Sequence, residues 1–279
     1  MSPSRALGAL LAATLMGQAA TALELRYVSH LKMHHPKIGL TEPSGLAVDE
    51  EASAFWIVSD ETQVVFRLDA NTGDVRAFTG RDGRMRDLEG VAVDADNKRL
   101  LMVSERTASI VTVSIEPPHR VSSIDLAELP GAKDLASALK DRGNGLEGIA
   151  IDPNTDTVFV LKEDAPRLLI ELAPRLDRIM SLHDLDKVLP GDGDVSGLTV
   201  DPYRQGLWIV SDRNKAVHFL PFGGDAPLTF ELYWRDKDRS RRLDNAEGVA
   251  LSSDGQTLFV LTDDGKHSRL VQYRISVED

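Results

Sequence analysis

One type of dipeptide, Ser-Gly or Glu-Gly, recurs five times along this chain, each time just before an apolar, small, apolar triplet. Successive copies lie 45, 58, 49 and 51 residues apart. A period near fifty residues indicates a repeat architecture, in which each repeat is one supersecondary unit. The five copies are Ser44-Gly45, Glu89-Gly90, Glu147-Gly148, Ser196-Gly197 and Glu247-Gly248.

Each copy continues with a polar turn and a second apolar run, such as Phe55-Trp56-Ile57-Val58. These runs are short, rich in β-branched and aromatic residues and bounded by turn residues, which is typical of strands. A third strand and often a fourth follow, and four antiparallel strands repeated radially make a β-propeller. We therefore predict an all-β, five-bladed β-propeller. A six-bladed ring is the alternative, if a degenerate unit lies within residues 112–145.

The two ends of the chain are expected to meet. The last repeat ends at Arg269–Ile275 without an outermost strand, and the N-terminal stretch Glu24–Leu31 has no hairpin of its own. We predict that this N-terminal strand closes the ring. Two insertions, Asp134–Lys140 and Asp184–Leu189, are predicted to form short helices.

Residues 1–22 have the pattern of a secretory signal peptide: one charge at Arg5, an apolar run over Ala6–Met16 and the small-residue site Ala20-Thr21-Ala22. The apolar run is shorter than the roughly 20 residues of a membrane-spanning helix. Residues 23–279 are then a single propeller domain, periplasmic or secreted, with no membrane span after cleavage. An uncleaved signal would tether it to the membrane.

Composition excludes several classes of function. The chain has no cysteine, so neither a disulfide nor thiol chemistry is available. Its net charge of −12 disfavours nucleic acid and anionic membranes as partners. The negative charge suits metal cations as ligands, or serves solubility alone. We expect the protein to be a monomer.

The repeat brings acidic residues to one place. The first strand of a propeller blade lies beside the central channel, so all five dipeptides are expected around one mouth of that channel. Because strand side chains alternate with period two, the residues two positions earlier are expected to form a second tier. The predicted metal ligands are Glu89, Glu147 and Glu247, then Glu42, Asp87 and Asp194; the predicted ligand-binding residues are Ser44, Ser196, Asn245, Arg241 and Arg242.

Converging carboxylates repel one another, which raises their pKa values unless a cation compensates. A ring of carboxylate oxygens with few histidines suits Ca²⁺, with Mg²⁺ as second choice, rather than zinc. The alternative is purely architectural. The glycines would then permit close packing of the inner strands, and the glutamates would cap backbone N–H groups of neighbouring blades.

Three of the repeats carry a family resemblance, through Glu42-Pro43-Ser44-Gly45-Leu46, Asp87-Leu88-Glu89-Gly90-Val91 and Gly145-Leu146-Glu147-Gly148-Ile149. With the Phe-Trp-Ile-Val-Ser-Asp type of second strand, they resemble the SdiA-regulated family of exported or membrane-tethered bacterial proteins. More distantly the motif is similar to phytase-like esterase and gluconolactonase-type propellers. The resemblance covers the mature chain and implies a five-bladed propeller with a central metal but no assigned activity. Serine at two of the five ring positions departs from an acidic ring.

Two functions fit these features. The first is an exported propeller that binds a divalent cation at the acidic mouth and a small molecule or protein on that face. The alternative is a metal-dependent hydrolase of esters, lactones or phosphoesters. There a metal would polarise the substrate, Glu147 or Asp87 would act as base, and Arg241 and Arg242 would hold an anionic group.

Overall fold

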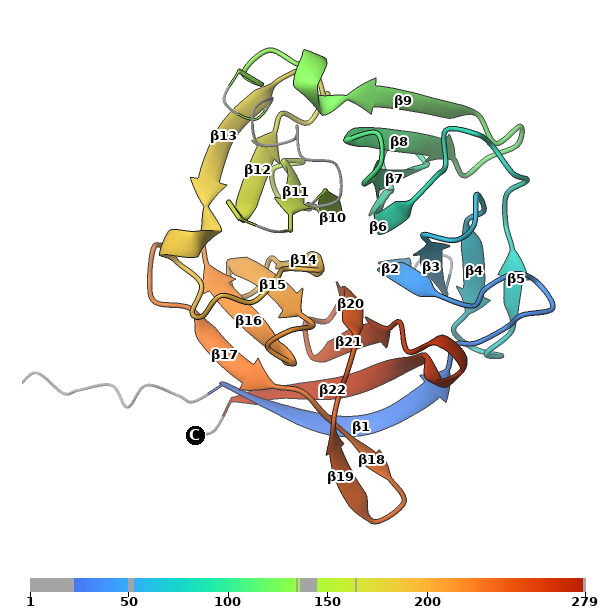
Figure 1. The fold of residues 1–279 in the computed structure, drawn as a ribbon, viewed down its shortest axis with the longest axis vertical. Helices are drawn as coiled ribbons and strands as arrows, with labels where there is room; N and C mark the ends of the chain where they lie inside the picture. The colour runs from blue at the N-terminus through green and yellow to red at the C-terminus, as the bar shows by residue number, and fades with distance from the viewer. Residues whose placement is uncertain (1–22, 50–52, 134, 136–144, 164, 278–279) are drawn as a thin grey trace, which may run out of the picture.

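Five four-stranded antiparallel sheets surround a common axis in this computed structural model, as Figure 1 shows in a view close to that axis. The structure describes residues 23–49, 53–133, 135, 145–163 and 165–277. The predicted signal peptide over residues 1–22 and most of the insertion predicted as a helix over Asp134–Lys140 lie outside the described residues. The prediction of a five-bladed β-propeller is confirmed.

Blades 1 to 4 each use four consecutive strands, with the first strand innermost. Blade 1 contains β2 Pro43–Asp49, β3 Ala54–Ser59, β4 Phe66–Asp69 and β5 Val75–Ala77. Blade 2 contains β6 Leu88–Asp94, β7 Arg99–Ser104, β8 Ser109–Ser114 and β9 Val121–Asp125. Blade 3 contains β10 Leu146–Ile151, β11 Val158–Lys162, β12 Leu168–Leu172 and β13 Ile179–Asp184. Blade 4 contains β14 Gly197–Asp201, β15 Gly206–Ser211, β16 Ala216–Pro221 and β17 Leu228–Glu231.

Blade 5 joins the two ends of the chain. It contains β20 Ala246–Leu251, β21 Thr257–Thr262 and β22 Arg269–Val277, with β1 Leu23–Lys32 as its outermost strand. β1 pairs antiparallel with β22 from Leu23 opposite Val277 to Lys32 opposite Arg269. The predicted closure by the N-terminal strand is therefore confirmed. The pairing with β1 covers the edge that β22 would otherwise expose at the junction of the two termini.

Apolar residues of adjacent blades form the core. The second strand of each blade is buried almost throughout; in blade 1, Trp56 and Ile57 are at most 1% exposed. One buried cluster joins Ala92 of blade 2 to Ile149 and Val160 of blade 3, which shows that packing runs between blades as well as within them. With no cysteine in the chain, burial of this apolar surface carries the stability of the fold.

Three short 3-10 helices and one extra hairpin interrupt the β pattern within the residues that the structure describes. They are η1 Leu126–Glu128, η2 Leu185–Lys187, η3 Gly265–His267 and the hairpin of β18 Tyr233–Asp236 with β19 Arg239–Arg242. η2 lies within Asp184–Leu189, where a short helix was predicted. The basic stretch 235–242 forms most of the hairpin, which extends outward past β1 and β22 in Figure 1. Among the described residues, no helix is long and apolar enough to cross a membrane.

Candidate functional site

The five dipeptide glycines bring the inner strands into contact at the narrowest part of the central channel. A Cβ atom on Gly45 would lie 2.7 Å from the backbone oxygen of Glu89, and one on Gly90 would lie 2.9 Å from that of Glu147. Only glycine permits this approach, because real Cβ contacts at such distances essentially do not occur. The space left at this level is about 10 Å³, at most the room of one water molecule.

The two serines of the ring hold neighbouring blades together. The Ser44 hydroxyl of blade 1 donates to the backbone oxygen of Leu88 in blade 2. The Ser196 hydroxyl of blade 4 donates to the backbone oxygen of Ala246 in blade 5, at 2.7 Å. Both side chains are buried. In these two blades the ring position therefore makes an interblade hydrogen bond, an architectural contact.

The three glutamates occupy the same ring position without such a contact. Among the described residues, the carboxylates of Glu89, Glu147 and Glu247 have no hydrogen-bond donor and no ion-pair partner. Glu147 is only 8% exposed. A carboxylate taken out of water without a donor or cation is costly, so it tends to stay protonated.

Burial and mutual repulsion raise the pKa values of all three carboxyls. Burial, with smaller contributions from the charges of Asp60 and Glu105, raises the pKa of Glu89 to about 8. The pKa of Glu147 lies well above its usual range because of burial, then the charge of Glu89. Burial likewise raises the pKa of Glu247, with Asp212 and Glu89 adding to it. At neutral pH the mouth therefore either holds protons or attracts a cation.

Two further acidic side chains reach Glu147 from the loops that follow the second strands. Carboxylate oxygens of Glu105, Glu147 and Glu163 lie within 4.8 Å of one another. Backbone hydrogen bonds place these loops beside the entry to the inner strands: Glu105 N–H donates to Asp87, and Glu163 N–H donates to Gly145. Sequence analysis missed Glu105 and Glu163 as candidate ligands, although an acid follows the second strand in both blades.

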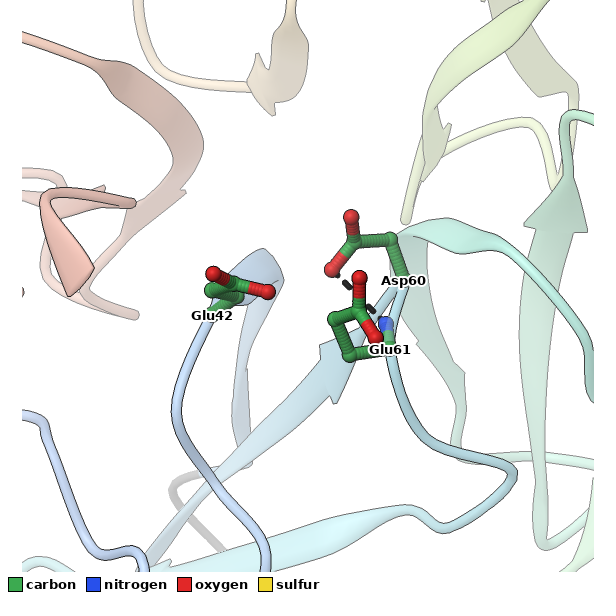
Figure 2. Close-up of side chains that lie close together, drawn as sticks. All are labelled: Glu42, Asp60 and Glu61. Atoms are coloured by element: carbon green, nitrogen blue, oxygen red, sulfur yellow. Dashed lines mark hydrogen bonds between the residues drawn. The ribbon is translucent and has the colours of Figure 1, made fainter.

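A second acidic group lies at the rim in blade 1. Figure 2 shows Glu42, from the segment before β2, facing Asp60 and Glu61, which follow β3. Their carboxylate oxygens also lie within 4.8 Å of one another. Burial, with smaller contributions from Asp263, Glu42 and Glu61, raises the pKa of Asp60 to about 6, although a hydrogen bond from the Glu61 backbone N–H opposes this rise. Of the predicted second-tier residues, Glu42 is thus the one whose carboxylate oxygens lie within 4.8 Å of those of two other acidic side chains among the described residues.

The other second-tier residues are engaged elsewhere. Asp87 is paired with Arg106. Asp194 accepts from the Ser211 hydroxyl at 2.8 Å and from the backbone N–H of Arg213, and the Asn245 side chain donates to the backbone oxygen of Asp263.

The alternation of side chains that predicted the second tier does not extend beyond the ends of the strands. Asp87 and Asn245 have φ values of +45° and +54°, which lie outside the strand region. Register also shifts beside the dipeptide in four blades, at Pro43/Leu46, Leu88/Gly90, Leu146/Gly148 and Ala246/Gly248. A bulge re-aims the side chains before it, so alternation cannot be extended across it.

Arg241 and Arg242 lie on the outer hairpin. Arg241 pairs with Asp236 at 3.2 Å and Arg242 with Glu231 at 2.7 Å. β18 packs on β1, and Arg269 lies 3.8 Å above the Trp234 ring, so the hairpin is anchored at the perimeter of blade 5. The structure does not bring these two arginines to the glutamate ring.

Comparisons with known proteins fit the architecture. A family model described as SdiA-regulated matches residues 19–263. A glutaminyl cyclase from Myxococcus xanthus is similar at 13% identity and a TM-score of 0.60, over 91% of this chain and 97% of that one. A PQQ-bound aldose sugar dehydrogenase from Streptomyces coelicolor is similar at 13% identity and a TM-score of 0.55, over 92% and 99%. A chain of a nidogen/laminin complex is similar at 15% identity and a TM-score of 0.56, over 82% and 74%. At these identities the likeness concerns the fold alone.

Proposed function

The chain belongs to the SdiA-regulated family, and from this premise we propose that it is an exported propeller that binds a divalent cation at its acidic mouth. The cation would be Ca²⁺, with Mg²⁺ second. The same face would receive a small molecule or a protein. The observation that carries this proposal is the set of three glutamates, Glu147 buried and Glu89 and Glu247 half-buried, that line one narrow space at the glycine ring with no hydrogen-bond donor among the described residues.

The side chains present fit a hard cation. Ca²⁺ takes six to eight oxygen ligands at about 2.3–2.6 Å in flexible geometry, so ligand oxygens a few ångströms apart suit it. The carboxylate oxygens of Glu105, Glu147 and Glu163 meet this condition. The charge of Glu89 acts on Glu147 and would also attract the cation. A bound Ca²⁺ would favour the ionised carboxylates and remove the cost of their mutual repulsion.

A pocket beside Glu89 supports the second part of the proposal. It has a volume of about 500 Å³ and includes Asp60, Glu105, Arg86 and Arg106 in its lining. Cationic and anionic side chains in one pocket of this size favour a polar ligand of small-molecule dimensions. Such a ligand would reach both the arginines and a cation held at Glu147.

The hydrolase remains the second candidate, and the same pocket is the observation that favours it. Glu89, a carboxyl of raised pKa, lines this pocket together with Arg86 and Arg106, whose guanidinium groups would bind an anion. In this alternative, Arg86 and Arg106 of blade 2 would hold the anionic group in place of Arg241 and Arg242. Glu147 stays the candidate base, whereas Asp87 is held by Arg106.

Cation binding is tested by equilibrium dialysis with radioactive calcium, after removal of resident metal with a chelator. Wild-type protein is expected to bind Ca²⁺ with a Kd below about 1 mM, the range of extracellular calcium modules. Glu147→Gln and Glu105→Gln keep the side-chain shape and remove a charge, and each should weaken binding by about tenfold or more. Glu128→Gln, at an exposed site on η1, is the matched control and should bind as wild type does.

Two results would contradict the cation site: no binding of Ca²⁺ or Mg²⁺ to the wild type, or full binding by Glu147→Gln. Hydrolysis is tested separately with p-nitrophenyl esters, lactones and phosphoesters. Activity that persists after chelation would exclude the metal-dependent mechanism, and no activity with intact Ca²⁺ binding would favour the binding protein.

A further inference from the structure

The end of the channel opposite the acidic mouth forms an apolar cup. Its volume is about 490 Å³, and its walls come from the inner strands of all five blades and the turns that follow them. Half-buried apolar side chains face it near the ends of these strands, namely Val48, Val93, Ile151 and Leu251. An apolar concavity shared by all blades is unlike the scattered apolar residues of an ordinary protein surface.

The glycine ring closes the floor of the cup. The inner-strand residues directly after the glycines line both the cup and the narrow space of about 10 Å³ at the ring. Nothing larger than a water molecule fits there, so the cup does not continue into the acidic mouth. The molecule therefore has two separate concave sites at opposite ends of one axis, with different chemistry.

The charge of the cup limits what it can bind. Among the described residues of its lining, Asp49 is the only charged side chain, and it accepts a hydrogen bond from Trp56 Nε1 at 3.0 Å. No lysine, arginine or histidine stands among those residues to neutralise an anion. An anionic ligand would thus lose its hydration without a compensating charge, whereas a neutral apolar ligand would lose little.

Hydrogen bonds between the turns of blades 4 and 5 hold the rim of the cup in place without a ligand. The Tyr203 hydroxyl in blade 4 donates to the backbone oxygen of Ser253 in blade 5. Arg204 Nη1 in the same turn donates to the backbone oxygen of Gly255 at 2.7 Å. These two bonds connect the turns of adjacent blades. Thr199 adds a hydroxyl group to the wall, while the Ser252 hydroxyl there donates to Asp254 at 2.6 Å. Ligand sites of this size are usually preformed and mostly apolar, with a few polar groups that orient the ligand.

We propose that this cup binds one neutral, largely apolar small molecule, with its apolar part on the floor and a hydroxyl or amine at the rim near Asp49 and Ser252. Removal of apolar surface from water drives the binding. A closed floor and a volume within the range of small-molecule sites favour such a ligand over a protein segment. The inference does not depend on a cation at the other mouth.

The test uses two probes that differ by one charge: N-phenyl-1-naphthylamine, which is neutral, and 1-anilinonaphthalene-8-sulfonate, its anionic counterpart. Fluorescence titration of the full chain should give saturable binding of the neutral probe at one site per chain. The sulfonate should bind about tenfold more weakly or not at all. Chelation of divalent cations should leave both results unchanged, which separates this test from that of the acidic mouth.

Ile151→Asp and Val93→Asp, made singly, each place a charge in the wall of the cup. Each variant that keeps the circular dichroism spectrum of the wild type should bind the neutral probe at least about tenfold more weakly. Met180→Asp, on an exposed site of β13, is the matched control and should bind normally. Absence of saturable binding to the wild type would overturn the proposal, as would unchanged binding in a folded cup variant. Self-association that buries the cup and excludes the probe would also overturn it.

Discussion

Blades 1 and 4 carry serine at the ring position where blades 2, 3 and 5 carry glutamate. The backbone setting is shared, since in every blade a glycine follows and meets the next blade. The outcomes are opposite. Ser44 and Ser196 donate hydrogen bonds to the next blade, whereas the glutamate carboxylates find no hydrogen-bond or ion-pair partner within the described part of the chain, and their ionised forms repel one another. One ring position therefore makes an interblade hydrogen bond in two blades and, in three, carries a carboxyl whose ionised form is disfavoured, which is the arrangement expected where a bound ligand stabilises the ionised form.

The largest expected effect concerns the glycine that both kinds of blade share. A Cβ atom at Gly197 would overlap the backbone oxygen of Glu247, and backbone atoms cannot move aside without shifting a blade. Gly197→Ala should therefore lower the free energy of unfolding by about 3 kcal/mol or more, measured by urea denaturation. Gly80→Ala is the control, because a Cβ there meets nothing within 4 Å. Equal stability of the two variants would show that the ring is looser than its geometry indicates.

The second effect concerns the glutamates and depends on pH. The pKa of Glu89 is about 8 in the folded protein, against 4.5 for an unperturbed carboxyl. A raised folded pKa contributes stability below the unfolded pKa, and this contribution is lost as pH rises through about 8. Metal-free Glu89→Gln should thus match the wild type at pH 5 and exceed it at pH 9 by on the order of 2 kcal/mol, after allowance for screening by solvent.

Urea denaturation in the presence of a chelator measures this difference, with Glu128→Gln as the exposed control. Added Ca²⁺ should reverse the order at pH 9, because the wild type binds the cation in the folded state. If Glu89→Gln shows the same pH profile as the wild type, the glutamates do not carry the repulsion that distinguishes their blades.

The third effect has the opposite sign and concerns the serines. Ser44→Ala leaves the buried backbone oxygen of Leu88 without its donor. The variant should lose about 1 kcal/mol of stability, equally at pH 5 and pH 9, because no titrating group is removed. Ser123→Ala, at an exposed position of β9, is the control. A loss that varies with pH would mean that the serine also senses the charge of the glutamates.

The sequence sufficed for the fold because the signals of a propeller are local and repeated. Strand patterns, turns and the period of the dipeptide are readable without knowledge of long-range contacts, and so is the unpaired N-terminal strand. The convergence of Glu89, Glu147 and Glu247 follows from the same repeat, since equivalent positions meet at the axis.

What the sequence could not predict depends on contacts between segments. Glu105 approaches Glu147 because backbone bonds position its loop, and no periodicity reports this. The left-handed backbone at Asp87 and Asn245 breaks the alternation on which the second tier was predicted. The donor role of Ser44 requires knowledge of which carbonyl the next blade presents. Arg241 and Arg242 were predicted as ligand-binding residues, but the stretch 235–242 pairs as an outer hairpin in which Arg241 lies opposite Trp234.

The smallest expected effect tests whether that hairpin belongs to the site at all. Arg241 forms a half-exposed ion pair with Asp236, and exposed pairs typically contribute less than about 1 kcal/mol. Arg241→Gln should change the stability by no more than about 0.5 kcal/mol and leave Ca²⁺ binding unchanged. Arg86→Gln, in the pocket beside Glu89, is the informative partner. It removes a positive charge near the glutamates, so it should strengthen Ca²⁺ binding and weaken the binding of any anionic ligand to that face. If Arg241→Gln rather than Arg86→Gln weakens an anionic ligand, the hairpin takes part in binding despite its place at the perimeter, and the functional surface extends from the ring to the outer edge of blade 5.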